Sequence, residues 1–264
     1  MAEGDTIHRL ANKLARGLVG TPLTSFELPR SALAGPAPGT LVEAVEARGK
    51  HLLIRFADGH VLHTHLRMEG TWHLYSPRER WRRPRRQLRA LLITERATAA
   101  CFNAPVVELL DDGALSRHPV LRQLGPDLCL TDVDLDEVVS RILRFVEEGA
   151  PLVDLLLDQR VAAGLGNVYK AEIAFLHGLH PLTRVAAIDE PTRRALFADG
   201  ARLLQRNLAS GRRTTVDGAR PGSLWVYDRA GRPCRRCGTP IEVAHLGRDA
   251  RITYWCPVCQ PAPT

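Results

Sequence analysis

Two cysteine pairs near the C-terminus constrain the fold of this chain more than any other feature of its sequence. Cys234 and Cys237 form one Cys-x-x-Cys pair, Cys256 and Cys259 form the other, and 18 residues separate the pairs. This is the spacing of a zinc site with four thiolate ligands, in which each pair supplies two ligands from one tight turn. Four thiolates complete a tetrahedral site and leave no open position. We therefore expect one structural Zn²⁺ in a zinc ribbon.

Charge patterning favours a polyanionic partner. The net charge is +7, and only three of the 36 basic residues are lysines, while the others are arginines. Arginine makes bidentate contacts with phosphate groups, so the composition favours nucleic acid as the partner. The alternative is a basic protein without such a partner, and charge alone does not separate the two.

Nothing in the sequence predicts a membrane or export segment. No run approaches 18 uncharged apolar residues, and residues 1–5 lack the basic and apolar regions of a secretory signal. Clustered cysteines in such a chain indicate metal binding rather than disulfides. We expect a cytoplasmic protein with no membrane partner.

Hydrophobic periodicity predicts an α+β chain. Apolar residues spaced by three and four predict an amphipathic helix over 5–18. Short apolar runs between turn signals over about 22–125 predict an antiparallel β-domain, either a sandwich or a barrel. With the helical segments that follow, these patterns predict three domains, at residues 1–128, 129–223 and 224–264.

Helical periods return in the second of these domains. They cover 131–150, a segment after Pro151, the stretch from 167 to about 177, and 191–209. Residues 210–223 are rich in Gly, Arg, Ser and Thr and predict a loop.

A glycine-rich turn precedes one of these helices. Residues 163–166 read Ala-Gly-Leu-Gly, Asn167 follows, and Lys170 lies one turn further on. The N-terminus of a helix offers free backbone N–H groups and a positive dipole end, which suit a phosphate. On these residues alone, an ordinary helix hairpin with an asparagine cap is the favoured interpretation.

The N-terminus offers an amine for covalent chemistry. Ala2 is small, so removal of Met1 is expected to expose its α-amino group just before a helix. An α-amino group has a pKa of about 7.7–8.0, against about 10.4 for lysine, and is therefore the most available neutral amine near pH 7. Attack on a sugar C1′ would give a Schiff base, with Glu3 as general acid or base. On local residues alone, an ordinary chain terminus is the favoured interpretation, because most chains begin near a charged residue.

Taken together, these segments resemble the formamidopyrimidine-DNA glycosylase/endonuclease VIII family, and most closely its actinobacterial endonuclease VIII-like branch. The resemblance covers essentially the whole chain, and several motifs occur in the family's order. The matching segments are Glu3–Thr6, Arg48–Leu53, His65–Trp72, Leu124–Leu128, residues 156–170 and Tyr254–Gln260. The resemblance implies a β-sandwich with a leading helix, a helix–two-turn–helix domain and a zinc ribbon.

The resemblance also implies catalytic roles. The residue after Met is the family's nucleophile, which places Ala2 in that position, and Glu3 corresponds to the acid that helps open the deoxyribose. Lys50, which is expected in a strand, corresponds to the lysine of the β-elimination step. Arg251, between the cysteine pairs, corresponds to the ribbon arginine that reaches the lesion phosphates.

DNA-binding roles carry over in the same way. Asn167 corresponds to the asparagine that binds the DNA backbone, and Lys170 lies in the same matched turn. Met68, next to Arg67, lies in the loop that fills the gap left by a flipped nucleotide, a role that suits an apolar wedge. The resemblance therefore implies Arg67, Met68, Asn167 and Lys170 as DNA-binding residues.

One position departs from the family. The family nucleophile is proline, whose adduct with an aldehyde is a charged iminium, whereas an alanine amine gives an imine that must be protonated to withdraw electrons. Three explanations stay open: an active natural variant that uses Ala2, a natural variant that binds lesions without turnover, and an alteration introduced at position 2.

The leading hypothesis is a bifunctional DNA glycosylase/AP lyase of base excision repair. It would act as a monomer on damaged double-stranded or partly single-stranded DNA and flip oxidised bases into a cleft between the first two domains. A second hypothesis is a non-catalytic lesion-binding protein, motivated by Ala2. A third is an architectural DNA binder, motivated by the seven arginines of residues 78–89.

Overall fold

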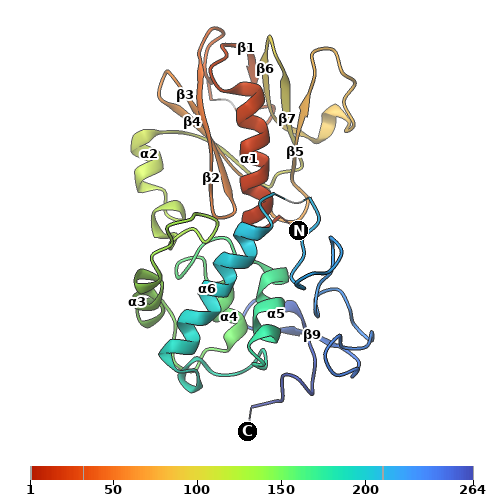
Figure 1. Cartoon of the computed structure of the whole chain (residues 1–264). Helices are drawn as coiled ribbons and strands as arrows, with labels where there is room; N and C mark the ends of the chain where they lie inside the picture. The colour runs from red at the N-terminus through yellow and green to blue at the C-terminus, as the bar shows by residue number, and fades with distance from the viewer. Residues whose placement is uncertain (1, 32, 210, 264) are drawn as a thin grey trace. The chain divides into compact units, whose positions relative to one another are not determined.

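The structure is a computed structural model that describes residues 2–31, 33–209 and 211–263. The chain forms two compact units, Met1–Arg122 and Gln123–Thr264, each with its own buried hydrophobic cluster (Figure 1). Met1, whose removal the sequence predicts, lies outside the described residues. No helix in the described ranges is long and apolar enough to cross a membrane.

The first unit consists of a leading helix and two four-stranded antiparallel sheets. The strand orders are β1-β6-β7-β5 and β2-β3-β4-β8. The elements are α1 (Gly4–Leu18), β1 (Leu23–Glu27), β2 (Val42–Arg48), β3 (His51–Phe56), β4 (His60–His65), β5 (Thr71–Tyr75), η1 (Arg85–Gln87), β6 (Leu88–Thr94), β7 (Thr98–Phe102), β8 (Val106–Asp111) and α2 (Asp112–Arg117).

Strand alternation places one apolar face of each sheet in a shared core. Leu52 and Ile54 of β3 belong to the same buried cluster as Leu92 of β6 and Ala99 of β7. The helix α1 adds apolar residues at spacings of three and four, namely Ile7, Ala11, Leu14 and Leu18. Two sheets around one core make this part of the chain a sandwich rather than a barrel.

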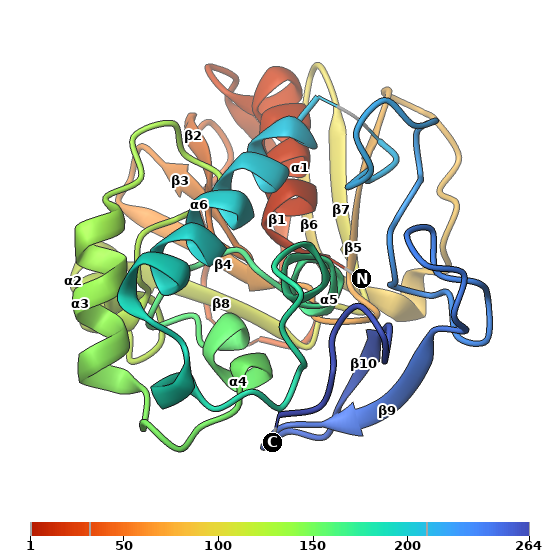
Figure 2. The same cartoon turned by 60° about the horizontal axis from the view of Figure 1, so that its bottom comes forward.

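The second unit is helical and ends in a small two-stranded sheet (Figure 2). Its elements are α3 (Leu135–Phe145), α4 (Leu152–Leu157), α5 (Asn167–Leu176), η3 (Val185–Ala187), α6 (Glu190–Arg206), β9 (Glu242–Leu246) and β10 (Arg251–Trp255). The helices α3 and α6 begin at aspartate caps, because Asp134 and Asp189 each accept a hydrogen bond from a first-turn backbone N–H.

The helix α5 differs from the others because it is buried almost all round. Every residue from Asn167 to Phe175 is buried, including Lys170 and Glu172. Apolar residues therefore cover more than one face of this helix, which is typical of a helix in the centre of a unit. Two charged side chains at its middle must find partners inside the protein.

The observed architecture confirms the predicted α+β class: antiparallel sheets first, helices next and clustered cysteines last. The predicted helix over 5–18 is observed at Gly4–Leu18, and the segment predicted over 131–150 is shorter, at Leu135–Phe145. The division into three domains at residues 128 and 223 stays a prediction.

Candidate functional site

The chain's first residues form the start of α1. Ala2 is half-buried against the sandwich core, and Glu3 is fully buried at the N-cap position. The Glu3 carbonyl accepts hydrogen bonds from the N–H groups of Thr6 and Ile7, at 2.9 and 3.1 Å. Its carboxylate does not cap the helix. The fold therefore keeps a carboxyl group out of water one residue from Ala2, where an acid can act on chemistry at a neighbouring amine.

Lys50 lies in a two-residue turn between β2 and β3. Arg48 pairs with His51 across this turn, and Gly49 adopts a φ of +57°, which permits the tight reversal. The positive charge of Lys50 acts on two neighbouring histidines, His51 and His65, and contributes to lowering the pKa of each. Lys50 is thus held at a rigid hairpin end rather than on a mobile loop.

Met68 is presented to solvent by the turn that follows β4. It is 64% exposed, which is unusual for a large apolar side chain. Arg67 beside it has a φ of +47°, and the N–H of Gly70 donates to the Leu66 carbonyl at 2.9 Å. A Cβ at Gly70 would lie 2.6 Å from that carbonyl oxygen, so the turn requires glycine. Arg67 and Met68 also line a surface hollow of ≈ 410 Å³.

Asn167 begins α5 but does not cap it. Gly166 occupies the N-cap position, with an extended φ of −130°, and Asn167 is the first helical residue. The predicted asparagine cap is therefore wrong. Because the N-cap residue Gly166 has no side chain, it makes no side-chain hydrogen bond to the first N–H groups of α5.

Lys170 is not at the surface. Its side chain is fully buried, and its ammonium group donates to Thr253 Oγ1 at 2.7 Å and to the Ile252 carbonyl at 3.1 Å. These contacts join α5 to β10 within the second unit. The structure gives no support to the predicted contact of Lys170 with DNA, because its charge is already satisfied inside the protein.

The four C-terminal cysteines converge as the spacing predicts. Their sulfur atoms all lie within 4.8 Å of one another, with Cys234 and Cys259 3.9 Å apart and Cys237 and Cys256 3.4 Å apart. Four thiolates at about 2.3 Å from a tetrahedral Zn²⁺ would stand about 3.8 Å apart. The backbone N–H groups of Arg236 and Cys259 also point at the sulfurs of Cys234 and Cys256, each at 3.4 Å. The cluster is suited to holding one metal ion.

Arg251 lies at the start of β10, between the two cysteine pairs. Its side chain is about half exposed, and its only ion pair among the described residues is a long one of 3.6 Å to Asp249. A loosely paired arginine on a rigid strand is available for an anionic ligand. The sequence-predicted residues are thus shared between the units: Ala2, Glu3, Lys50, Arg67 and Met68 belong to the first, and Asn167, Lys170, Arg251 and the cysteines to the second.

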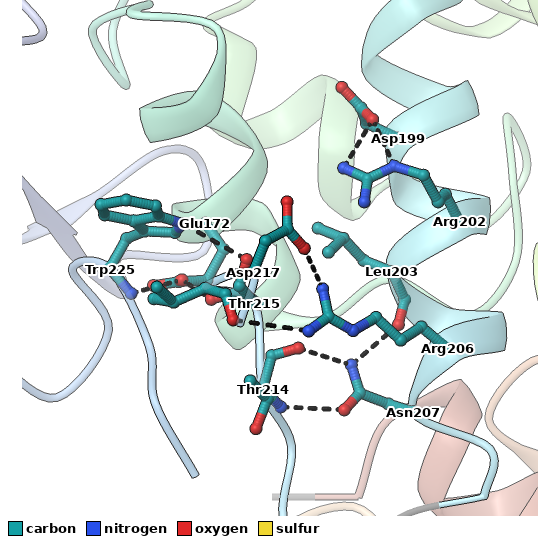
Figure 3. Close-up of polar contacts among 11 residues, drawn as sticks. Glu172, Asp199, Arg202, Leu203, Arg206, Asn207, Thr214, Thr215, Asp217 and Trp225 are labelled. Carbon is teal, nitrogen blue, oxygen red and sulfur yellow. Dashed lines mark hydrogen bonds and ion pairs between the residues drawn. The ribbon is translucent and has the colours of Figure 1, made fainter. Parts of the chain in front are cut away.

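Sequence reasoning missed Glu172, which organises the long loop before the cysteines (Figure 3). Its buried carboxylate accepts hydrogen bonds from the Thr215 hydroxyl and from the backbone N–H groups of Trp225, Val226 and Tyr227. Burial raises the pKa of this carboxyl, and the four donors partly offset the shift. Its position two residues after Lys170, in an otherwise apolar helix, was the signal that could have revealed it.

Asn207 holds the other end of the same loop (Figure 3). Its amide donates to the Thr214 carbonyl at 3.1 Å and accepts from the Thr214 N–H at 2.8 Å. Arg206 forms an ion pair with Asp217. The described part of the predicted 210–223 loop therefore has a defined conformation, fixed by side chains of α5 and α6.

Comparisons with known proteins agree with these features. Residues 1–105 match the formamidopyrimidine-DNA glycosylase N-terminal domain, and residues 124–218 match the formamidopyrimidine-DNA glycosylase H2TH domain. The chain is 39% identical, over its whole length and 95% of the relative, to a probable endonuclease 8 2 of Streptomyces coelicolor. It is 38% identical, over 99% of its length and all of the relative, to the DNA-(apurinic or apyrimidinic site) lyase Nei2 of Mycolicibacterium smegmatis.

Solved structures show the same fold. Lactococcus lactis formamidopyrimidine-DNA glycosylase, non-covalently bound to DNA with an AP site, superposes with a TM-score of 0.82 at 24% identity. The match covers 98% of this chain and all of that one. This chain combines a leading α-helix, a two-sheet sandwich, a helical unit and a four-cysteine cluster. Together with the family matches, this architecture identifies a class of multidomain DNA repair protein. This chain belongs to the formamidopyrimidine-DNA glycosylase/endonuclease VIII family.

Proposed function

We propose that this protein is a bifunctional DNA glycosylase/AP lyase of base excision repair, which removes oxidised bases and cleaves the abasic strand. The observation that carries the proposal is the fully buried Glu3 carboxylate directly after Ala2, in a chain whose relatives include an AP lyase. We infer that it acts as a monomer on chromosomal DNA in the cytoplasm.

In the proposed mechanism, the α-amino group of Ala2 attacks C1′ of the damaged nucleotide, and the base departs. Glu3, whose carboxyl group is fully buried beside Ala2, supplies the proton that helps open the deoxyribose. The product is a protonated imine, which withdraws electrons from C2′ and so permits strand cleavage. Lys50, in its rigid turn, assists that elimination.

DNA contacts are assigned to three exposed side chains and to the N-terminus of α5. Met68 is the wedge that fills the space of a flipped nucleotide, and Arg67 beside it contacts phosphate. The N-terminus of α5 at Asn167, where the N-cap residue is a glycine, and the half-exposed Arg251 bind phosphates. Lys170 is left out of this set because it is buried.

The four cysteines would hold one structural Zn²⁺. Their mutual distances fit a tetrahedral site of thiolates, and four protein ligands leave no position for a water or substrate. The ion would stabilise the segment that carries Arg251 and takes no part in the chemical steps.

Borohydride trapping on a duplex with one abasic site tests the proposal. The expected result is a covalent complex with the native chain, and no complex with an N-terminally acetylated chain or with Glu3→Gln. Ala2→Pro supplies the secondary amine of the family and is expected to trap at least as well. A native chain that binds the duplex but forms no covalent complex contradicts the lyase assignment.

A second function is favoured by the same residue. Ala2 replaces the proline that the family resemblance implies, so the protein would bind abasic sites without turnover. This alternative predicts tight binding to an abasic duplex, no product over long incubation, and a gain of cleavage in Ala2→Pro.

A further inference from the structure

A hollow of ≈ 410 Å³ lies beside the exposed Met68, within the first unit. Its volume falls in the range of ligand pockets, about 300–1,000 Å³. Most of its lining is polar or charged, and includes Arg30, Arg67, Met68, Glu69, Arg89 and Asn103. Three guanidinium groups, an amide and a carboxylate around one hollow form an array of hydrogen-bond donors and acceptors rather than an apolar groove.

The polar side chains of this hollow are not used elsewhere in the described part of the chain. The three arginines, Glu69 and Asn103 form no side-chain hydrogen bond and no ion pair with any residue of 2–31, 33–209 and 211–263. The Nε atom of Arg89 is sealed from solvent and has no partner there. A sealed donor without an acceptor is unfavourable for folding, so stability does not explain its place in this hollow.

The backbone departs from regular geometry at three of these residues. Arg89 is the extra residue of a β-bulge in β6, because its two neighbours in that strand pair with consecutive residues of β7. Arg67 and Asn103 have left-handed backbone, with φ of +47° and +54°. Bulges re-aim side chains, and left-handed backbone is uncommon for residues other than glycine. Irregular positions of this kind cluster at functional sites, and here all three bring polar side chains to one hollow.

Tight packing holds the segments around the hollow in place. A Cβ at Gly70, in the turn of residues 67–70, would lie 3.0 Å from Ala104 Cα, so this turn rests directly on the segment after β7. The Asn103 backbone N–H donates to the Gln87 carbonyl at 2.9 Å, two residues before the bulge. The array of donors and acceptors is therefore preorganised, which lowers the cost of binding a ligand.

The proposed wedge places one particular group beside this hollow. When Met68 fills the space of a flipped nucleotide, the base on the opposite strand loses its partner, and its Watson–Crick edge is left without hydrogen bonds. A hollow next to Met68 that is lined with unused donors and acceptors is suited to that edge. The excess of guanidinium groups over carboxylates suits the negative strand that carries the base.

The carboxylate of Glu69 distinguishes among the four bases. Its two oxygens can accept a parallel pair of hydrogen bonds. Guanine offers two adjacent donors on its Watson–Crick edge, N1–H and the N2 amino group, with the acceptor O6 beside them. Adenine and cytosine offer one amino group next to a ring-nitrogen acceptor, and thymine offers one N–H between two carbonyl groups. Guanine alone matches both oxygens of Glu69 and leaves O6 for the Arg89 guanidinium.

We propose that this hollow binds the base opposite the flipped nucleotide and selects guanine, through a bidentate contact of Glu69 with N1–H and the N2 amino group and a contact of Arg89 with O6. Oxidised cytosine stands opposite guanine in a duplex, so the selection directs the protein to lesions that arise from cytosine. The inference rests on the proposed function, because it requires Met68 to act as the wedge.

Binding of the full chain to a duplex with a tetrahydrofuran abasic analogue tests the proposal apart from the chemistry, because the analogue has no aldehyde for an amine to attack. The dissociation constant is measured with G, A, C or T opposite the analogue, at one salt concentration. We expect binding with G opposite to be about tenfold tighter than with the other three bases, which is the size of one bidentate contact.

Glu69→Gln keeps the shape of the side chain but removes one acceptor oxygen. It should bring the four dissociation constants within about twofold of one another. Glu95→Gln is the matched control, because it removes an exposed carboxylate from the turn between β6 and β7, outside the lining of the hollow. It should keep the preference for guanine.

Arg89→Lys separates the reading of a base from general attraction to DNA. Lysine keeps the positive charge and loses the planar fork of donors. We expect the preference for guanine to narrow by about threefold, while the slope of log K against log salt stays the same. A preference that stays the same in Arg89→Lys overturns the contact with O6.

Each outcome decides between the claims. An unaltered chain with equal affinity for the four duplexes overturns the inference, and so does a guanine preference that survives in Glu69→Gln. An equal loss of affinity for all four duplexes in Glu69→Gln also overturns it, because the effect is then one of charge or structure. A chain that binds the analogue no better than an intact duplex overturns the proposed function and the inference together. A chain that prefers guanine but gives no complex in borohydride trapping overturns the lyase assignment alone.

Discussion

The carboxylate of Glu172, in the middle of α5, accepts a hydrogen bond from the Trp225 backbone N–H at 2.7 Å, across 53 positions of sequence. Three further donors converge on the same group, from Thr215, Val226 and Tyr227. One buried side chain thus joins Thr215 to residues 225–227 within the loop that leads to the cysteine cluster.

Glu172→Gln should destabilise the protein strongly. The amide nitrogen that replaces one carboxylate oxygen would face N–H donors, and donors left unsatisfied in the interior are costly. We expect a loss of about 3 kcal/mol or more in the free energy of unfolding, measured in urea. Hydrogen exchange at residues 225–227 should quicken more than exchange in α3. Unchanged protection of those three amides would argue against the anchoring role.

Lys170→Met should change stability and leave the electrostatics of DNA binding intact. The ammonium group is buried against Thr253 and Ile252, so it releases no counterions on binding. The dependence of log K on log salt should keep its slope, whereas Arg251→Gln should reduce that slope by about one. Circular dichroism shows whether each variant is folded. A reduced slope in Lys170→Met would restore its predicted contact with phosphate.

Metal removal should unfold the end of the chain. Binding of zinc to a four-thiolate site supplies folding free energy, so chelation is expected to release one Zn²⁺ per chain and lower the melting temperature. Cys237→Ser should bind zinc more weakly, and Cys101→Ser, at a buried position far from the cluster in sequence, is the control for thiol loss. Metal content by mass spectrometry decides the identity of the ion.

The arginine-rich segment 78–89 should contribute to DNA affinity without recognising damage. Trp81 packs it against a small cluster that includes Tyr75 and Phe102, so its arginines are carried on an anchored loop. Replacing Arg82, Arg83 and Arg86 by Gln should reduce the salt slope by up to about three, equally for intact and abasic duplexes. Arg194→Gln, paired with Asp136 in the second unit, is the control. A change confined to abasic DNA would contradict this.

Stability should fall as the pH drops below the ordinary pKa of histidine. The pKa values of His51 and His65 are lowered to about 2 and about 4, so the folded state resists protons that the unfolded chain accepts below about pH 6.5. The stability is fully present above that pH and declines toward the folded-state values. Each histidine contributes at most about 1.4 kcal/mol per pH unit. His65→Gln should flatten the decline between pH 6.5 and 5, as followed by urea unfolding.

Much of the fold follows from local patterns in the sequence. The period of α1, the cysteine spacing and the short alternating strands all depend on residues close together in the chain, which is why they could be predicted. The sandwich, rather than a barrel, depends on which strands pair, and no local pattern specifies that.

Only some residues of the candidate site could be placed from local sequence. Met68 lies in a turn, as the family resemblance implies, whereas Lys50 was expected in a strand and lies in the turn between β2 and β3. A lysine near a helix start suggests a phosphate contact, but the burial of Lys170 depends on β10, 82 residues away, and no local pattern predicts that burial. The contact between His63 and Glu108 was missed because these residues meet only through the register of β4 and β8, although the pattern His63-x-His65 placed two histidines on one strand face.

One strand register decides which residues of the β3–β4 hairpin face the core and which face outward, so a change in the length of this hairpin affects both faces. An insertion or deletion of one residue in the turn at 57–59 that shifted the pairing would move Leu62 to the outer face and His63 into the core. Loss of the core and loss of the hydrogen bond between His63 and Glu108 would then occur together. Length variation is therefore expected to be tolerated in the arginine-rich loop long before it is tolerated in this turn.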